Sequence, residues 1–197
     1  MKLVLASGNA GKLAEFRELF ADTPFDFHPQ SEFGVEDVEE TGLTFVENAL
    51  LKARHAARIS GLPAIADDSG LCVDALDGAP GLYSARYAGS HGDSKANIDT
   101  LLHALAGVPQ ERRTARFVCV LALLRHAEDP QPIIAQGTWE GRILDAPRGG
   151  NGFGYDPVFL VPAVGLSAAE LNAADKHRLS HRGQALARLH RQLLQQE

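Results

Sequence analysis

The sequence predicts an α/β protein, and three observations support this fold class. The chain has 197 residues with 45% apolar content, which is enough to bury a substantial core. Short apolar runs typical of strands alternate with segments of helical periodicity. No stretch has the composition of a linker, so we expect one domain covering residues 1–197.

Charge and cysteine content exclude several classes of protein. The formal net charge of -6 argues against coating a nucleic-acid polymer, but it leaves room for a local cationic pocket that takes a small phosphorylated molecule. Cys72 and Cys119 lie in apolar runs and are expected to be reduced core thiols. The first apolar run is broken by Gly8, and no run reaches transmembrane length. We therefore expect a soluble, cytoplasmic protein with no membrane partner.

The amino-terminal segment has the order strand, glycine turn, helix. Residues 3–6 predict a strand, residues 7–11 a tight turn, and Lys12 opens a helix with Phe16 on its apolar face. Such a turn exposes backbone N–H groups at the positive end of a helix, beside Lys12, and this arrangement favours phosphate. The turn is not a Walker A loop, because its glycines are too close together. A plain helix-entry turn explains it about as well.

An acid-rich loop and a capped helix come next. Residues 25–28 predict a short strand, and residues 32–42 form the loop, which ends in Glu39-Glu40-Thr41-Gly42. Thr44-x-x-Glu47 has capping-box spacing and predicts a helix to about Ser60. Asn48 and Lys52 share one face of that helix, so Lys52 can point toward the acids. A solvated loop and an exposed lysine are the commoner alternatives.

The stretch from Leu62 to Leu71 contains the most informative acids. Its apolar run stops at Asp67-Asp68-Ser69-Gly70, which predicts a buried strand that presents acids at its carboxyl end, where open α/β sheets place ligands. Adjacent buried carboxylates repel each other, so a metal or a cationic side chain is expected beside them. A solvated turn is the alternative. Residues 71–76 predict a further strand paired with the preceding one.

The middle of the chain supplies packing elements. Residues 78–81 predict a turn, and residues 93–105 predict an amphipathic helix for core or oligomer packing. Residues 117–124 are the longest apolar run and predict a central strand, and residues 133–144 are expected to return beside it as an antiparallel hairpin.

The carboxyl-terminal third carries a second group of candidate residues. Residues 149–157 are too rich in glycine for regular structure, and they embed Phe153 and Tyr155 as a candidate stacking platform. Ser167-x-x-Glu170 predicts a short helix. Ser180-His181-Arg182-Gly183 leads into a terminal helix that turns its leucines inward, namely Leu186, Leu189 and Leu193.

Five motifs in this order closely resemble the inosine and xanthosine triphosphate pyrophosphatases. They are Ser7-Gly8-Asn9-Ala10-Gly11-Lys12, Glu39-Glu40-Thr41-Gly42 with Phe45 and Asn48, Asp67-Asp68-Ser69-Gly70, Phe153-Gly154-Tyr155-Asp156-Pro157 and Ser180-His181-Arg182-Gly183. The resemblance implies hydrolysis of ITP, dITP or XTP to the monophosphate and pyrophosphate, with Mg²⁺ as cofactor at one or more ions per subunit, in a homodimer. It also implies a mixed, curved sheet in two lobes with the nucleotide cleft between them.

The resemblance also assigns roles to residues. It implies that Glu40 and Asp68 hold Mg²⁺, with Asp68 as general base and Lys12 as a further catalytic residue. Implied phosphate contacts are Ser7, Gly8, Asn9, Ala10, Gly11 and Lys12, and the cationic Lys52 joins them as charge compensation for the triphosphate. Implied nucleotide contacts are Ser69, Phe153, Gly154, Tyr155, Asp156, Lys176, His181 and Arg182.

Three other functions remain open at this stage. A nucleotide-sensing module would use the same turn and loop, but carboxylates facing a polyanion would weaken binding unless a metal and chemistry required them. A septum-inhibitor-like pyrophosphatase acting on modified pyrimidine or methylated nucleotides ranks below the purine enzymes, because Phe153 and Ser180-His181-Arg182 match the purine family. A haloacid-type phosphatase ranks lowest, since its Asp-x-Asp pattern is absent from the strand ends.

Overall fold

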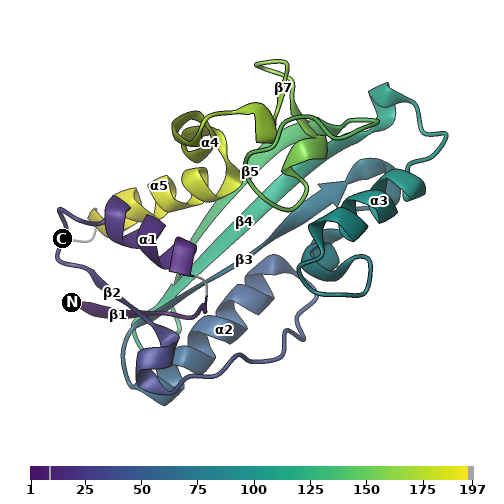
Figure 1. Ribbon diagram of the computed structural model, residues 1–197. Coiled ribbons are helices and arrows are strands. Elements are labelled where there is room, and N and C mark those ends of the chain that lie inside the picture. Colours follow the sequence, from purple (N-terminus) through teal and green to yellow (C-terminus); the bar gives the residue numbers. More distant parts are fainter. Residues whose placement is uncertain (9, 195–197) are drawn as a thin grey trace. The chain divides into compact units, whose positions relative to one another are not determined.

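The computed structural model describes residues 1–8 and 10–194, and within them it contains a mixed seven-stranded sheet (Figure 1). The strands lie in the order β2-β1-β3-β4-β5-β6-β7. Strand β1 pairs in parallel with β2 and β3, whereas β6 pairs antiparallel with β5 and β7. The α/β prediction is therefore confirmed. The strands are β1 (Lys2–Leu5), β2 (Asp26–Pro29), β3 (Ala64–Val73), β4 (Thr114–Leu124), β5 (Ile133–Ile143), β6 (Phe159–Val161) and β7 (Leu166–Ser167).

The helices begin and end close to where sequence signals place them. Thr44 caps α2 by accepting a hydrogen bond from the Glu47 N–H, and Gly61 ends that helix with a positive φ of 69°. Asp93 caps α3 in the same way. No helix in residues 1–8 and 10–194 is long and apolar enough to cross a membrane. The α-helices are α1 (Ala10–Leu19), α2 (Phe45–Ser60), α3 (Ser94–Ala104), α4 (Ala173–Leu179) and α5 (His181–Leu194).

Contacts divide the chain into two compact units. The first comprises Met1–Asp68, Cys119–Gly137 and Gln184–Glu197, and the second comprises Ser69–Val118 and Thr138–Gly183. Strands β3, β4 and β5 each contribute residues to both units.

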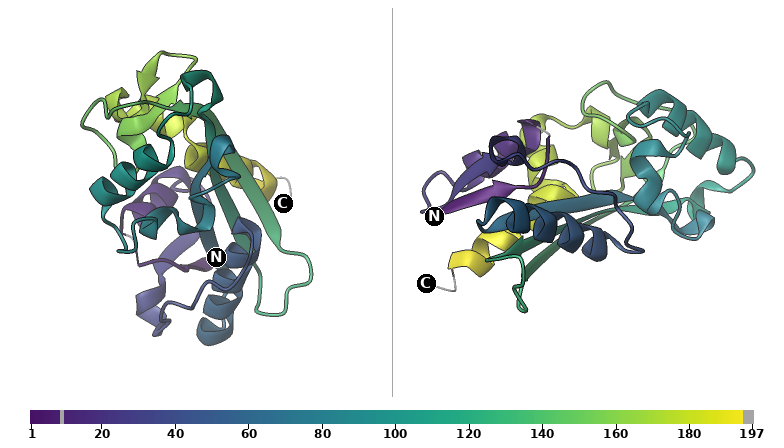
Figure 2. Two further views of the ribbon diagram at one scale, coloured as in Figure 1. Left: turned by 90° about the vertical axis from the view of Figure 1, so that its right-hand side faces the viewer. Right: turned by 90° about the horizontal axis from the view of Figure 1, so that it is seen from below.

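In the first unit, alternate strand residues point to opposite faces. Leu3, Leu5 and Ile65 share one core cluster with Phe16 of α1, with Phe20 directly after that helix and with the leucines of α5. On α2, the buried side chains are mainly alanines, and this helix contacts β1. Figures 1 and 2 show α1 and α5 on one face of these strands and α2 on the other. Side chains of neighbouring β3 residues therefore meet different helices.

The second unit is built around packed aromatic rings. Phe159 lies 4.5 Å from Phe117 and 5.2 Å from Trp139, measured between ring centroids. Ile98 and Leu101 of α3 join the same cluster. On β4, Arg116 alternates with these core residues and pairs with Asp74, so the sheet here has one apolar and one charged face.

Strand β3 corrects one prediction. We expected a strand ending at the two acids and a second strand over residues 71–76, but β3 runs without interruption from Ala64 to Val73. Asp, Ser and Gly favour turns only when no better partner for the backbone exists. Here β3 lies between β1 and β4, and hydrogen bonding to neighbouring strands outweighs the turn preference.

Smaller differences lie at element ends. Helix α1 begins at Ala10 rather than Lys12, and β4 begins at Thr114 rather than Phe117. Helix α4 and the strands β6 and β7 were not predicted from the sequence. Strands β4 and β5 are neighbours in the sheet, as expected. Ser167 and Glu170 do form a capping box, on a single turn of 3₁₀ helix.

Candidate active site

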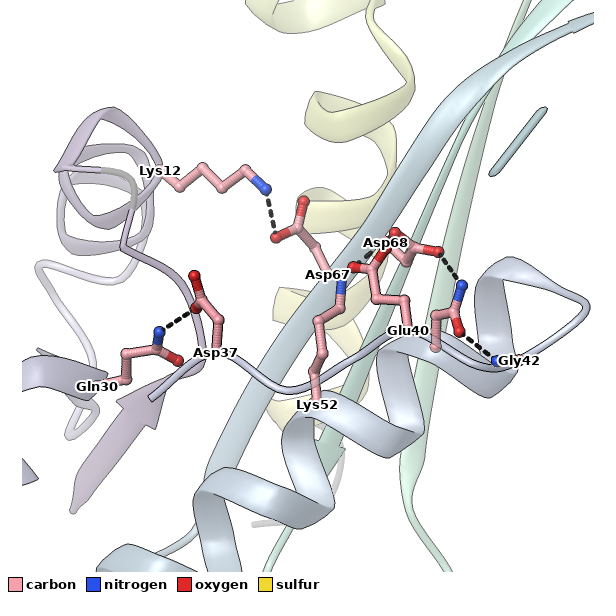
Figure 3. A network of polar contacts seen from close by, with 9 residues as sticks. Lys12, Gln30, Asp37, Glu40, Gly42, Lys52, Asp67 and Asp68 are labelled. Atoms are coloured by element: carbon pink, nitrogen blue, oxygen red, sulfur yellow. Dashed lines mark hydrogen bonds and ion pairs between the residues drawn. The ribbon is translucent and has the colours of Figure 1, made fainter. Parts of the chain in front are cut away.

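The two adjacent acids of β3 have different surroundings. Consecutive strand residues point to opposite faces, so Asp67 faces the side of α1 and Asp68 the side of α2 (Figure 3). Each acid contacts a lysine from the helix on its own side. The predicted cationic neighbours are therefore present, one for each carboxylate.

Asp67 pairs with Lys12. The Lys12 Nζ lies 2.8 Å from the Asp67 Oδ1, and the Asp67 side chain is only 1% exposed while Lys12 keeps 21% exposure. A buried carboxylate needs such a partner, because isolated burial of its charge would be costly. Lys12, predicted to bind phosphate, is thus anchored at the first turn of α1 by a buried acid.

Asp68 shares Lys52 with Glu40. The Lys52 Nζ lies 2.5 Å from the Glu40 Oε1 and 3.2 Å from the Asp68 Oδ1, so the two carboxylates converge on one cationic group. Burial raises the pKa of Asp68, and Lys52 offsets only part of that effect. Burial opposes the charged form of Lys52, but Asp68 and Glu40 more than compensate, so its pKa is also raised.

Two hydrogen bonds, one on each side of Glu40, hold the loop that carries this residue (Figure 3). Before Glu40, the Gln30 Nε2 donates to the Asp37 Oδ1 at 2.6 Å. After it, the Gly42 N–H donates to the Asn48 Oδ1 at 2.8 Å. The predicted solvated loop is therefore held in place around its acid, although it contains no regular structure between Gly34 and Thr44.

The predicted phosphate turn follows β1. The Ser7 N–H donates to the Leu5 carbonyl at 2.8 Å, and Gly8 is exposed, with no atom within 4 Å of where a Cβ would stand. Ala10 and Gly11 open α1, so the turn leads directly to the positive end of a helix dipole. The predicted contact at Asn9 lies outside the described residues.

In the second unit, the glycine-rich loop is organised by Asp156. This buried carboxylate accepts a hydrogen bond from the Phe153 N–H at 2.8 Å and pairs with the Lys176 ammonium group. Lys176 also lies over the Phe153 ring, 4.7 Å from its centroid. Gly152 has a φ of 79°, and a Cβ there would lie 2.2 Å from the Asp156 Oδ2. Only glycine fits this close approach.

Phe153 is the exposed part of this arrangement. It is 70% exposed, in contrast to Tyr155 at 4%. The Tyr155 hydroxyl donates to the Ser84 carbonyl at 2.8 Å, while the Ser84 Oγ accepts from the Leu71 N–H of β3. Tyr155 therefore anchors the loop, and Phe153 offers an open ring face for stacking.

Three more predicted residues lie on regular elements of the second unit. Ser69 is half-buried on β3. His181 and Arg182 form the start of α5, where the His181 ring stacks on Phe117 with centroids 4.9 Å apart. The Ser180 Oγ accepts the Gly183 N–H at 3.1 Å, and a Cβ on Gly183 would collide with the His177 carbonyl. Gly183 thus permits the close junction between α4 and α5.

The donor set fits a magnesium ion with few protein ligands. Glu40 and Asp68 supply hard carboxylate oxygens that already meet at one cationic group, Lys52, and Mg²⁺ prefers such oxygens together with water and substrate phosphates. Within residues 1–8 and 10–194, no group of three or more His, Cys, Asp or Glu side chains is arranged to hold a metal ion.

Predicted residues thus gather in one cluster within each unit. The first contains Lys12, Glu40, Lys52 and Asp68, and the second contains Phe153, Tyr155, Asp156 and Lys176. Sequence reasoning assigned no role to Asp67 as the anchor of Lys12 or to Asn48 as a partner of Asp68. The strand alternation of β3 and the four-residue spacing of Asn48 and Lys52 were the signals available.

Comparison with known proteins gives a consistent answer. The family model described as the Ham1 family matches residues 3–192. A dITP/XTP pyrophosphatase from Xanthomonas campestris pv. campestris is 65% identical over 97% of this chain and 96% of its own. Another from Vibrio cholerae is 57% identical over 99% and 98%.

Solved structures agree with this similarity. A HAM1 protein from Coxiella burnetii superimposes with a TM-score of 0.96 at 52% identity, covering 99% of both chains. A nucleoside-triphosphatase, or dITP/XTP pyrophosphatase, from Mycobacterium abscessus gives 0.84 at 44% identity, covering 96% of this chain and 98% of that one.

Proposed function

Because the chain belongs to the Ham1 family, we propose that it hydrolyses deaminated purine nucleoside triphosphates, namely ITP, dITP and XTP, to the monophosphate and pyrophosphate. Relatives named dITP/XTP pyrophosphatase support the substrate class. The observation that carries the proposal is the convergence of Glu40 and Asp68 on Lys52. Removal of these nucleotides from the pool is the expected role of the reaction.

The first unit supplies groups that suit a triphosphate. Residues Ser7 to Gly11 lead into the start of α1, and the positive end of a helix dipole attracts phosphate oxygens. Lys12 and Lys52 add two ammonium groups, and both remain partly exposed. We assign phosphate binding to these residues, and we assign to Lys12 the stabilisation of charge on the departing pyrophosphate.

Glu40 and Asp68 are the proposed magnesium ligands, for one or more ions in each subunit. When bound, Mg²⁺ supplies positive charge that stabilises the phosphate oxygens of the leaving group.

Asp68 is the proposed general base. Burial raises the pKa of Asp68, which makes its ionised form a stronger proton acceptor than an ordinary carboxylate. It would take the proton of the water that attacks the α-phosphorus, so that a new P–O bond forms while the bond to pyrophosphate breaks. Lys52, beside it, favours the charged form of the carboxylate and so offsets part of the effect of burial.

The second unit supplies groups that suit a purine. Phe153 offers a stacking face, and Lys176, His181 and Arg182 are hydrogen-bond donors that match the 6-oxo group of hypoxanthine and xanthine. Adenine presents an amino donor at that position, so it would leave such donors unsatisfied. Ser69, Gly154, Tyr155 and Asp156 are the remaining proposed nucleotide contacts.

Three properties of the whole protein belong to the same proposal. We propose that the chain acts as one bilobed domain covering residues 1–197, that it forms homodimers, and that it works in the cytoplasm. A solution mass of twice 21.1 kDa is the expected result for the dimer.

A panel of nucleoside triphosphates tests the proposed function directly. Pyrophosphate and orthophosphate release are measured separately for ITP, dITP, XTP, ATP and a modified pyrimidine triphosphate, with Mg²⁺ and with a chelator. Pyrophosphate release from the deaminated purines, dependent on Mg²⁺, is the expected result. Binding without turnover would indicate a nucleotide sensor, orthophosphate release a phosphatase, and preference for the pyrimidine a different class of pyrophosphatase.

A further inference from the structure

Asn48 contacts both the general base and the loop that carries Glu40. It lies at the end of the first turn of α2 and is almost completely buried, at 1% exposure. The Asn48 Nδ2 donates to the Asp68 Oδ2 at 3.2 Å, and the Asn48 Oδ1 accepts from the Gly42 N–H at 2.8 Å. The amide therefore uses a donor toward the acid and an acceptor toward the loop, which fixes its orientation.

Both carboxylate oxygens of Asp68 have a donor. Lys52 serves Oδ1 and Asn48 serves Oδ2. A carboxylate bound through one oxygen can still rotate about its side-chain bond, whereas contacts at both oxygens hold its plane. Lys52 also serves Glu40, so the neutral Asn48 is the partner that orients Asp68 without adding charge.

The glycine at position 42 independently supports a role for the Asn48 side chain, because the backbone of Gly42 lies too close to this amide for any larger residue. A Cβ at Gly42 would lie 2.6 Å from the Asn48 Oδ1 and 2.7 Å from the Glu47 Cβ. Both distances are shorter than real Cβ contacts allow, and Gly42 does not have a positive φ that would itself require glycine. The close approach to Asn48 and its neighbour therefore explains the glycine.

We propose that Asn48 is a positioning residue for the hydrolysis. It orients the Asp68 carboxylate and fixes the Glu40 loop at the same time, without touching the nucleotide. This inference rests on the proposed function, and it gives a role to a residue that the motifs contain without assigning it one.

Two substitutions of Asn48 separate the two contacts. Asn48→Asp keeps an acceptor for the Gly42 N–H but sets a carboxylate against Asp68. Asn48→Ala removes both contacts. If Asn48 orients Asp68, both variants should lose about 10- to 100-fold in kcat, as is typical when a supporting partner is removed, while KM for dITP stays nearly unchanged. Gly42→Ala, which pushes on the amide from the loop side, should lower kcat in the same way.

Thr44→Ala is the matched control. Thr44 caps the same helix and contacts Glu47, but the structure shows no contact of its side chain with Asp68 among the described residues. This variant should lower the melting temperature and leave kcat unchanged. Thermal melting and calorimetric binding of the monophosphate product without Mg²⁺ provide readouts that do not depend on turnover, and both should remain close to wild type in Asn48→Asp.

The outcomes distinguish this inference from the proposed function. If the wild type releases pyrophosphate and Asn48→Asp keeps its kcat, Asn48 only holds the loop and the inference is wrong. The inference is also wrong if Thr44→Ala and Asn48→Ala have similar melting temperatures and lose the same amount of kcat. A wild type that releases no pyrophosphate from any deaminated purine would overturn the proposed function, and the inference with it.

Discussion

Asp67 and Asp68 are chemically identical neighbours, yet they contact different residues. The pleat of β3 directs the first to Lys12 and the second to Lys52 and Asn48. The first is almost fully buried and the second remains partly accessible, at 1% and 12% side-chain exposure. Of the two, only Asp68 is both partly accessible and next to a second carboxylate, Glu40, and this difference supports Asp68 as the proposed base.

Asp68→Asn tests that assignment. The substitution keeps the shape and the contact with Lys52 but removes the charge and the proton acceptor, so turnover should fall by about 10²- to 10⁴-fold. Thermal melting should change little. The rate of pyrophosphate release and the melting temperature are measured on the same preparations, with Asp67→Asn as the comparison. Near-normal turnover in Asp68→Asn would contradict the assignment of Asp68 as the general base.

Lys12→Ala tests the phosphate assignment. A lysine that reaches the outer phosphates loses its partner when pyrophosphate leaves, so the substitution should weaken binding of a non-hydrolysable triphosphate far more than binding of the monophosphate. Calorimetry with both ligands measures this difference. Equal losses for the two ligands would mean that Lys12 acts mainly through its ion pair with Asp67.

Arg182→Ala and Phe153→Ala separate base selection from stacking. Removing Arg182, the proposed donor to the 6-oxo group, should cost dITP about 1–3 kcal/mol in transition-state binding and reduce the ratio of its kcat/KM to that of dATP. Stacking serves any purine, so Phe153→Ala should lower both activities and keep their ratio. The measurement is kcat/KM for the two substrates. An unchanged ratio in Arg182→Ala would favour exclusion by the shape of the Phe153 loop.

Residue-level contacts were only partly predictable from the sequence. The position of Lys52 was partly predictable. It shares one face of its helix with Asn48, so it was expected to point toward the acidic residues. The pairing of Lys12 with Asp67 could not be foreseen, since it depends on two elements separated by 55 positions. Asn48 was visible as part of a motif, but its link between Asp68 and Gly42 requires the loop conformation.

At the level of elements, strong local signals predicted their type well. The capping box at Thr44 and the expected end near Ser60 gave the correct bounds of α2, and the helix predicted over residues 93–105 lies within one residue of α3 at each end, because capping and helical periodicity are local signals. Strand β3 was misjudged at Asp67 to Gly70, where pairing with other strands decides the conformation. Helix α4 and the short strands β6 and β7 carried no comparable local signal.

The turn between β4 and β5 depends on one buried acid. Asp129 accepts hydrogen bonds from the Arg125 side chain and from the backbone N–H groups of Arg125 and Gln131, at 2.7–2.9 Å. Its side chain is 1% exposed. The bonds from Arg125 are the main reason that the pKa of Asp129 is strongly lowered.

Asp129→Ala should therefore lower the free energy of unfolding by about 1–3 kcal/mol at neutral pH. Because the pKa is lowered on folding, this contribution is complete above the ordinary pKa of 3.8 and is lost progressively as the pH falls from there through the lowered pKa of the folded state. Urea denaturation at pH 7 and pH 3 measures the change, with the exposed neighbour in Glu128→Ala as control. The difference between Asp129→Ala and wild type should shrink in acid. A difference that is independent of pH would contradict this account.

At the level of the whole molecule, the family resemblance extended the prediction further than the patterns did. Composition and periodicity predicted an α/β fold, and the mixed sheet confirms it. The resemblance to the inosine and xanthosine triphosphate pyrophosphatases is confirmed by the Ham1 family match over residues 3–192 and by relatives named dITP/XTP pyrophosphatase. The two-lobed arrangement with a nucleotide cleft stays a prediction, beside the observed division into two compact units. Contacts between distant segments are not contained in local patterns, so residue chemistry alone could not supply them.

The central claim is that water, activated by Asp68, attacks the α-phosphorus of a deaminated purine triphosphate. Hydrolysis of dITP in water enriched in ¹⁸O, followed by mass spectrometry of both products, locates the attacked atom. The account predicts the label in the monophosphate and none in pyrophosphate. Label in pyrophosphate would place the attack on the β-phosphorus and contradict the account.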